Sequence, residues 1–175
     1  MKKILVVVDY QNDFVSGSLG FKKAVGLEHA IINKIEQYKT NGHEVVFTFD
    51  THYDNYLQTQ EGKNLPLPHC IKDTEGWKLY GAIKQFFDDS TKAFEKSTFG
   101  SIELATYIAE GKYAQVELIG VVSNICVLSN AILAKAALPE AEIIVDADCI
   151  ASNDDGMNTK TLDIMEGMQI KVIHR

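Results

Sequence analysis

The chain has 175 residues, of which 46% are hydrophobic and 23% are charged, and this length is enough to bury a full core as one domain over residues 1–175. The net charge of −7 repels phosphate backbones and anionic membranes, which argues against nucleic acid and lipid as partners. Three cysteines do not make a disulfide framework, and the first apolar run, residues 4–8, is too short for an export signal or a membrane span. We therefore expect a cytoplasmic protein.

Short apolar runs that end in a polar residue predict buried strands along the chain. The first run, residues 4–8, ends at Asp9, and the second, residues 44–49, ends at Asp50. The other expected strands are residues 91–95, 116–122, 142–145 and 170–173. Helical spacing of apolar residues or helix-end signals predict helices at residues 26–40, 77–87, 101–109, 124–137 and 156–167, and residues 51–73 are expected to be irregular.

The alternation of strands and helices predicts an α/β fold, doubly wound, with a mostly parallel sheet and helices on both faces. In sheets of this kind, ligands bind outside the carboxyl ends of the strands. Asp9, Asp50 and Cys126 follow three of the predicted strands. Residues far apart in the sequence are thus expected to meet at one edge of the sheet.

Three residues near predicted strand ends are candidates for catalysis, and each also has an ordinary structural interpretation. Cys126 lies between a strand and a helix, where free backbone N–H groups favour a thiolate, but a lone cysteine is more often a small buried hydrophobe. Asp9 is placed as a general base or as a turn-forming residue. Lys96 follows a short strand and, taken alone, reads as a surface charge.

A second group of residues has the composition of a metal site. Asp50 and His52 alternate in an extended segment and can share a ligand, His69 follows in a proline-stiffened loop, and Glu61 lies between the histidines. Two histidines with one or two carboxylates suit zinc, iron or manganese, with positions left open for water or substrate. The alternative is a capping aspartate with two loop histidines.

Taken together, the chain resembles the isochorismatase-like cysteine hydrolases, and within them the nicotinamidase branch. The resemblance covers nearly the whole chain and rests on five segments: VVVDYQNDF (6–14), FTFDTH (47–52), LPHC (67–70), FEKSTFGS (94–101) and GVVSNICV (120–127). It implies an isochorismatase-like three-layer fold and an amide hydrolase that converts nicotinamide to nicotinate and ammonia. It also makes Asp9 the base, Lys96 the cationic partner and Cys126 the nucleophile.

The same resemblance implies a divalent metal, with zinc expected first, held by Asp50, His52 and His69, with Glu61 at the position of a further ligand in some nicotinamidases. It also implies a cis peptide between Val121 and Val122. The backbone N–H groups of Val122 and Cys126 would then form the oxyanion hole.

The chain departs from many nicotinamidases just before the second histidine, where they carry a tryptophan and this sequence has Leu65, Pro66 and Leu67. Phe14, Phe99 and Trp77 are then the expected contacts of the substrate ring. Two alternatives remain: another amidase of the family, acting on a carbamoyl or ureido compound, or a non-catalytic binding module on this fold. We further expect a small-molecule amide as the substrate, and a homo-oligomer.

Overall fold

A six-stranded parallel sheet forms the centre of the computed structural model, which describes residues 1–175. Its strands are β1 (Lys3–Val8), β2 (Glu44–Asp50), β3 (Ala93–Lys96), β4 (Gln115–Val121), β5 (Glu142–Ala151) and β6 (Lys171–Ile173). Their order is β3-β2-β1-β4-β5-β6, so the direction of winding reverses between β1 and β4. This is the doubly wound order that places a crevice at the carboxyl ends of those two strands, and it confirms the predicted fold class.

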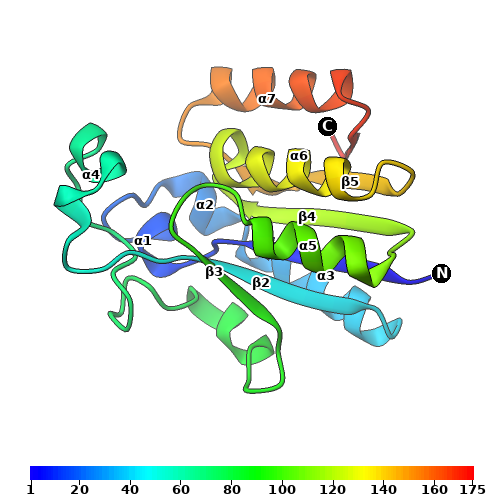
Figure 1. Ribbon diagram of the computed structural model, residues 1–175, viewed down its shortest axis with the longest axis horizontal. Helices are drawn as coiled ribbons and strands as arrows, with labels where there is room; N and C mark the ends of the chain where they lie inside the picture. Colours follow the sequence, from blue (N-terminus) through cyan, green and yellow to red (C-terminus); the bar gives the residue numbers. More distant parts are fainter.

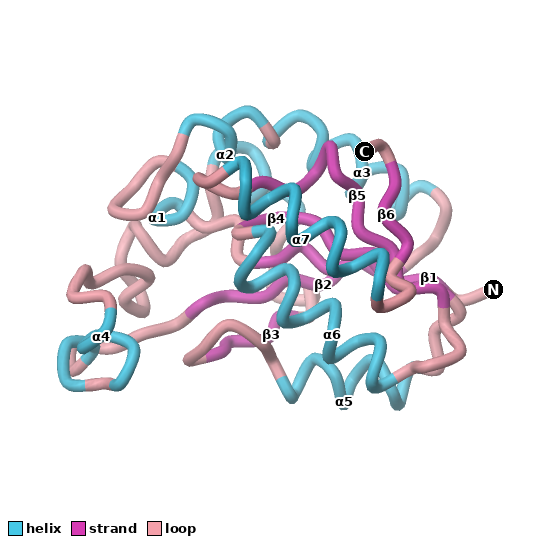
Figure 2. Tube along the Cα trace, turned by 90° about the horizontal axis from the view of Figure 1, so that it is seen from above, coloured by secondary structure: helices cyan, strands magenta, loops and turns pink.

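The helices cover both faces of the sheet, as the sequence predicts (Figure 1). On one face lie α5 (Ile102–Gly111), α6 (Leu128–Ala137) and α7 (Asp155–Gly167), which form one layer in both views (Figure 2). On the other face lie α2 (Lys22–Gly26), α3 (Glu28–Thr40) and the 3₁₀ helix η2 (Gly81–Phe86). None of the helices is both long and apolar enough to cross a membrane.

Alternate residues of β1 explain the two layers. Ile4, Val6 and Val8 belong to the core under α5, α6 and α7, whereas Leu5 and Val7 belong to the core under α3. Side chains of a strand point alternately to opposite faces, so a strand between two helical layers must be apolar throughout. The continuous apolar run at residues 4–8 therefore reports burial on both faces.

The remaining short elements gather beyond the carboxyl ends of the strands. They are α1 (Asn12–Val15), the 3₁₀ helix η1 (Tyr56–Gln58) and α4 (Gln60–Asn64), and α4 stands apart from the sheet in Figure 1. A π-helical turn, Ser123–Val127, precedes α6 and carries Cys126. The irregular stretch expected at residues 51–73 thus contains two short helices, both too short to show a helical period.

The prediction of a helix at residues 77–87 is wrong for the first residues of that range. Only Gly81–Phe86 is helical, as 3₁₀ helix, and the preceding residues bond elsewhere. The carbonyl of Trp77 accepts from Gln11 Nε2, and the N–H of Tyr80 donates to the carbonyl of Tyr10. These backbone groups form hydrogen bonds with the segment after β1 and are therefore not available for helical hydrogen bonds. Gly81, where the 3₁₀ helix begins, has a positive φ of 56°, which glycine adopts readily.

The strand expected at residues 142–145 also differs, because β5 continues to Ala151. Asp146 and Asp148 interrupt the apolar pattern there, and the pairing of β5 with β4 shifts register between Leu118 and Gly120. The strand continues past this bulge, and its polar residues there break the apolar pattern. The pattern alone therefore predicts that the strand ends at residue 145.

Lys34 of α3 joins two buried carboxylates across the sheet. Its Nζ lies 2.7 Å from Glu117 of β4 and 2.7 Å from Asp146 of β5, and the Lys34 side chain is 12% exposed. Lys34→Met should lower the free energy of unfolding by about 3 kcal/mol, because it leaves both carboxylates without their cation. Urea unfolding measures the change, with Lys160→Met on the exposed side of α7 as the control. Equal unfolding midpoints for the two variants would contradict this account.

Candidate active site

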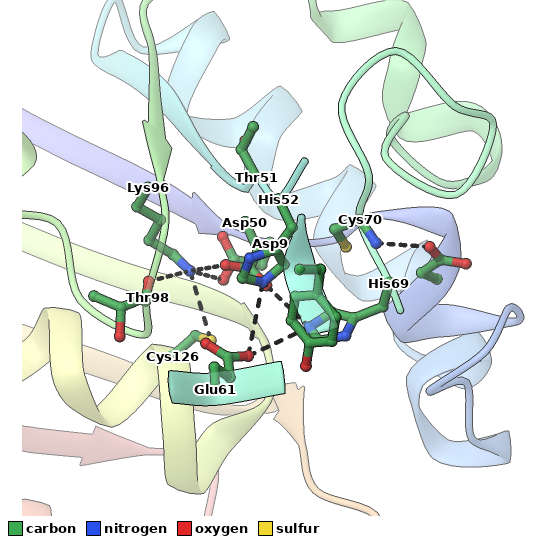
Figure 3. Close-up of polar contacts among 12 residues, drawn as sticks. Asp9, Asp50, Thr51, His52, Glu61, His69, Cys70, Lys96, Thr98 and Cys126 are labelled. Carbon is green, nitrogen blue, oxygen red and sulfur yellow. Dashed lines mark hydrogen bonds and ion pairs between the residues drawn. The ribbon is translucent and has the colours of Figure 1, made fainter. Parts of the chain in front are cut away.

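The structure brings Asp9, Lys96 and Cys126 together at the switch point of the sheet (Figure 3). Asp9 follows β1, Lys96 ends β3 and Cys126 lies in the turn after β4. Lys96 Nζ is 2.6 Å from Asp9 Oδ2 and 3.7 Å from Cys126 Sγ. The three residues are only 0%, 6% and 4% exposed. A lysine that looks like a surface charge in the sequence is therefore buried between a carboxylate and a thiol.

Neighbouring polar groups fix this buried cluster. Thr48 Oγ1 donates to Asp9 Oδ1 over 2.6 Å, and Lys96 Nζ also donates to the carbonyl of Thr98 over 3.0 Å. The same ammonium lies 3.4 Å from Asp50 Oδ1. Buried charges persist only when they are paired and hydrogen-bonded, and here both conditions hold.

Burial shifts the pKa values of both the thiol and the carboxylate in this cluster. Burial raises the pKa of the Cys126 thiol well above its ordinary value, with Lys96 opposing the rise. Burial also raises the pKa of Asp9, again against the effect of Lys96. The resting thiol is thus protonated and needs a base, and a carboxylate with a raised pKa is a stronger base than an ordinary aspartate.

The turn that carries Cys126 has the backbone feature that the resemblance implies. The peptide bond between Val121 and Val122 is cis. The Val122 carbonyl accepts from the N–H groups of Ile125 and Val127 over 3.1 and 3.2 Å, which closes the turn around Cys126. The assignment of the Val122 and Cys126 N–H groups to an oxyanion hole stays a prediction.

Asp50, His52, Glu61 and His69 form a second cluster beside the first, with ligand atoms all within 4.8 Å of one another. Asp50 Oδ2 lies 3.1 Å from His52 Nε2 and 3.4 Å from His69 Nε2. Glu61 Oε1 lies 3.7 Å from His52 Nε2 and 3.6 Å from His69 Nε2. Ligand atoms at bonds of about 2.1 Å stand about 3.4 Å apart around a tetrahedral ion and about 3.0 Å apart at right angles around an octahedral one. The observed spacings fit a divalent metal, and the octahedral arrangement of four residues leaves two positions open.

Hydrogen bonding orients one of the histidines for that role. His69 Nδ1 lies 2.9 Å from the carbonyl of Leu67, which can only accept, so Nδ1 carries the hydrogen. In the neutral ring the lone pair is then on Nε2, the atom that faces Asp50 and Glu61. A lone pair directed at two carboxylates is unfavourable unless a proton or a metal cation lies between them. The donor set therefore fits the metal that the sequence predicts.

Asp50 links the two clusters, because Oδ2 faces the histidines while Oδ1 faces Lys96. Burial opposes its ionisation. Without a metal, Nε2–H groups of His52 and His69 can donate to Asp50, and these hydrogen bonds together with the charge of Lys96 outweigh burial and lower the pKa of Asp50. For Glu61, burial and the nearby charge of Asp50 raise the pKa. A bound cation would satisfy both carboxylates.

A cavity of about 230 Å³ joins both clusters, which suits a small single-ring molecule. Cys126, Asp50, Glu61 and His69 form part of its wall. The rest consists of Phe14, Leu19, Phe21, Leu65, Phe99, Val122, Ile125 and Asn153. A nucleophile and a metal group thus share one largely apolar cavity.

Of the three expected ring contacts, the structure places Phe14 and Phe99 on this cavity and Trp77 outside it. The Trp77 ring packs on Phe49 at 4.9 Å between centroids, and its Nε1 donates to Thr51 Oγ1 over 2.9 Å. Trp77 is therefore part of the packing behind β2, and its assignment as a ring contact is wrong. The helix expected to carry it does not form, so its direction could not be read from helical spacing.

Comparison with known families agrees with this geometry. The model of the isochorismatase domain matches residues 3–175. This chain belongs to the isochorismatase family. An uncharacterised family member of Bacillus subtilis, PncA, is 34% identical over 89% of this chain and 90% of its own length. A nicotinamidase of Acinetobacter baylyi is 30% identical over 87% of this chain and 83% of its own length.

Among solved structures, a pyrazinamidase/nicotinamidase of Streptococcus mutans superimposes on this isochorismatase-family chain with a TM-score of 0.88. It is 29% identical, and the match covers 98% of this chain and 100% of the other. The three-layer isochorismatase-like fold that the resemblance implies is thereby confirmed.

Several residues of this isochorismatase-family site could not be predicted from the sequence pattern. The Gln11 side chain pairs with both backbone groups of Asp50: Nε2 donates to the carbonyl over 2.9 Å, and Oε1 accepts from the N–H over 2.8 Å. Its only sequence signal is its place two residues after Asp9. Leu19, Phe21 and Asn153 lie in loops, and no pattern directs them to the cavity.

Proposed function

We propose that this protein is a nicotinamidase, which hydrolyses nicotinamide to nicotinate and ammonia through a thioester on Cys126. The observation that carries the proposal is one cavity lined both by Cys126, the nucleophile of the buried cluster with Asp9 and Lys96, and by Asp50, Glu61 and His69 of the metal group. The broader class, a hydrolase of carbon–nitrogen bonds in amides, is supported by the relatives that are named nicotinamidases. A non-catalytic binding module is disfavoured, because all three triad residues are present and adjacent.

The residues of the cluster supply each proton that the reaction moves. Asp9 takes the proton of Cys126, and the sulfur attacks the amide carbonyl while backbone N–H groups hold the oxyanion. Protonated Asp9 then gives its proton to the nitrogen, the carbon–nitrogen bond breaks, and ammonia leaves a thioester. Asp9 next takes a proton from water, which attacks the thioester, and the acid departs as the proton returns to Cys126. Whenever the Asp9 carboxylate is ionised, it is paired with the ammonium of Lys96.

Asp50, His52, Glu61 and His69 would hold the metal, with zinc expected first and iron or manganese as alternatives. When bound, the metal offers a Lewis-acid position to a ring nitrogen or to water. Phe14 and Phe99, on the same cavity, are proposed to bracket the ring.

Protein purified without added metal should contain about one divalent ion per chain, since four preorganised ligands bind such an ion tightly. Elemental analysis measures the content, and dialysis against a chelator should lower kcat/KM for nicotinamide at least about tenfold. Adding zinc or manganese back should restore it. Full activity in a preparation shown to be free of metal would rule out the proposed role.

A panel of amides assayed for ammonia release tests the substrate. We expect nicotinamide and pyrazinamide to be hydrolysed, and benzamide to have a kcat/KM at least about 100-fold lower, because it leaves a polar position of the site unfilled. Benzamide is the matched control, since it has the same ring size and the same amide. Equal rates for benzamide and nicotinamide would refute the ring-nitrogen contact. A preference for a carbamoyl compound would assign the chain to another amidase of the family.

A further inference from the structure

One tyrosine lies behind both metal-group histidines. Tyr56 of η1 is 1% exposed, and its ring centroid lies 4.7 Å from that of His52 and 5.1 Å from that of His69. Both contacts are edge-on, at 62° and 75° between the ring planes. A single aromatic ring therefore limits the rotation of two imidazoles that come from different segments.

The hydroxyl of Tyr56 makes a hydrogen bond to the end of the segment that carries Glu61. It donates to the carbonyl of Leu65 over 2.9 Å, and the N–H of Leu65 donates to the carbonyl of Glu61 over 2.8 Å. At the other end, Thr59 Oγ1 donates to the carbonyl of Tyr56 over 2.7 Å and accepts from the N–H of Gly62 over 3.0 Å. The turn that bears Glu61 is thus tied to Tyr56 on both sides.

Close packing leaves this turn little freedom. A Cβ atom at Gly62 would lie 2.0 Å from the carbonyl oxygen of Tyr56, so α4 rests directly on the backbone of η1. The carboxylate of Glu61, the residue before Gly62, makes no hydrogen bond and only approaches the two histidines. Its carboxylate owes its place to the backbone of the turn.

We propose that Tyr56 is a positioning residue, which holds Glu61, His52 and His69 in the arrangement of a divalent cation site before the cation binds. Tyr56 offers no ligand atom and does not line the substrate cavity. The inference rests on the proposed function only in that a metal occupies this group. Residues behind metal ligands change metal affinity by about 10- to 100-fold when they are replaced, so the effect is measurable.

Zinc affinity of the metal-stripped full chain tests the proposal, measured by competition with a chromophoric chelator. Tyr56→Phe keeps the ring and removes only the hydroxyl, and it should weaken zinc binding about tenfold. Tyr53→Phe is the matched control: the same change three positions away, on a side chain that is 56% exposed, should leave zinc affinity within about twofold.

A double-variant cycle shows whether the effect passes through the carboxylate. If Tyr56 acts by placing Glu61, then Tyr56→Phe should weaken zinc binding much less in a Glu61→Gln background than in the wild type. Thr59→Val, which loosens the other end of the same turn, should behave in the same way, and it serves as the test if metal-free Tyr56→Phe melts at a lower temperature.

Unchanged zinc affinity in Tyr56→Phe, or losses that add fully with Glu61→Gln, would overturn the inference. A purely structural role would lower the metal-free melting temperature without this coupling. The proposed function fails separately: a chain that releases no ammonia from nicotinamide but loses zinc affinity with Tyr56→Phe supports the positioning role and contradicts the nicotinamidase proposal.

Discussion

Cys126→Ala should lower kcat/KM for nicotinamide by about 10⁴-fold or more, the largest effect expected of any single replacement in this protein. Cys126 is the only thiol or hydroxyl side chain in the cavity lining, and the lining carboxylates and imidazole belong to the proposed metal group. The variant should keep its fold, since alanine fits wherever a 4% exposed cysteine was packed. Ammonia release measures activity, and circular dichroism checks the fold.

The other two cysteines are the matched controls. Cys70 and Cys149 are also free and buried, but both belong to the core on the opposite face of the sheet from Cys126. Burial raises the pKa of Cys149 to about 12, as it also raises the pKa of Cys126, but neither Cys70 nor Cys149 lines the cavity. Cys70→Ala and Cys149→Ala should retain most activity. A Cys126→Ala protein as active as these two would refute the covalent route.

Asp9→Asn should lower kcat by about 10³-fold while changing KM little, because an amide of the same shape cannot accept the thiol proton. It also removes the carboxylate that lies 2.6 Å from Lys96, so the buried ammonium keeps only its weaker partner Asp50 at 3.4 Å. We therefore expect a lower melting temperature as well. Steady-state kinetics and thermal unfolding measure the two effects.

Asp89→Asn, in an exposed loop, controls for loss of one negative charge and should leave both quantities unchanged. If Asp9→Asn raised KM and left kcat intact, Asp9 would be a binding residue, and the base would have to be sought elsewhere.

Sequence reasoning worked where one rule of parallel sheets applies. Asp9, Asp50 and Cys126 follow three apolar runs, and the carboxyl ends of parallel strands share one edge, so their meeting could be predicted before any contact was seen. The resemblance added Lys96, whose surroundings in the sequence give no sign of burial. In the structure its burial comes from Asp9 and Cys126, which are distant along the chain.

Prediction failed where long-range contacts decide local structure. The segment around Trp77 has helical spacing, but its carbonyl bonds to Gln11 and no helix forms there. In the sequence, Leu65 stands out only as a departure from the family pattern, whereas in the structure it forms part of the cavity wall. Asn153 reaches the cavity because β5 runs past its bulge to Ala151. The expected homo-oligomer stays a prediction.

Mass spectrometry of the enzyme quenched during turnover of nicotinamide tests the central claim most directly. The account predicts a nicotinoyl group in thioester linkage on the peptide that carries Cys126, at up to one group per chain. It should form faster than, or as fast as, ammonia is released, and it should be absent from Cys126→Ala. Steady ammonia release with Cys126 unmodified at every quench time, or an acyl group on Cys70 or Cys149, would contradict it.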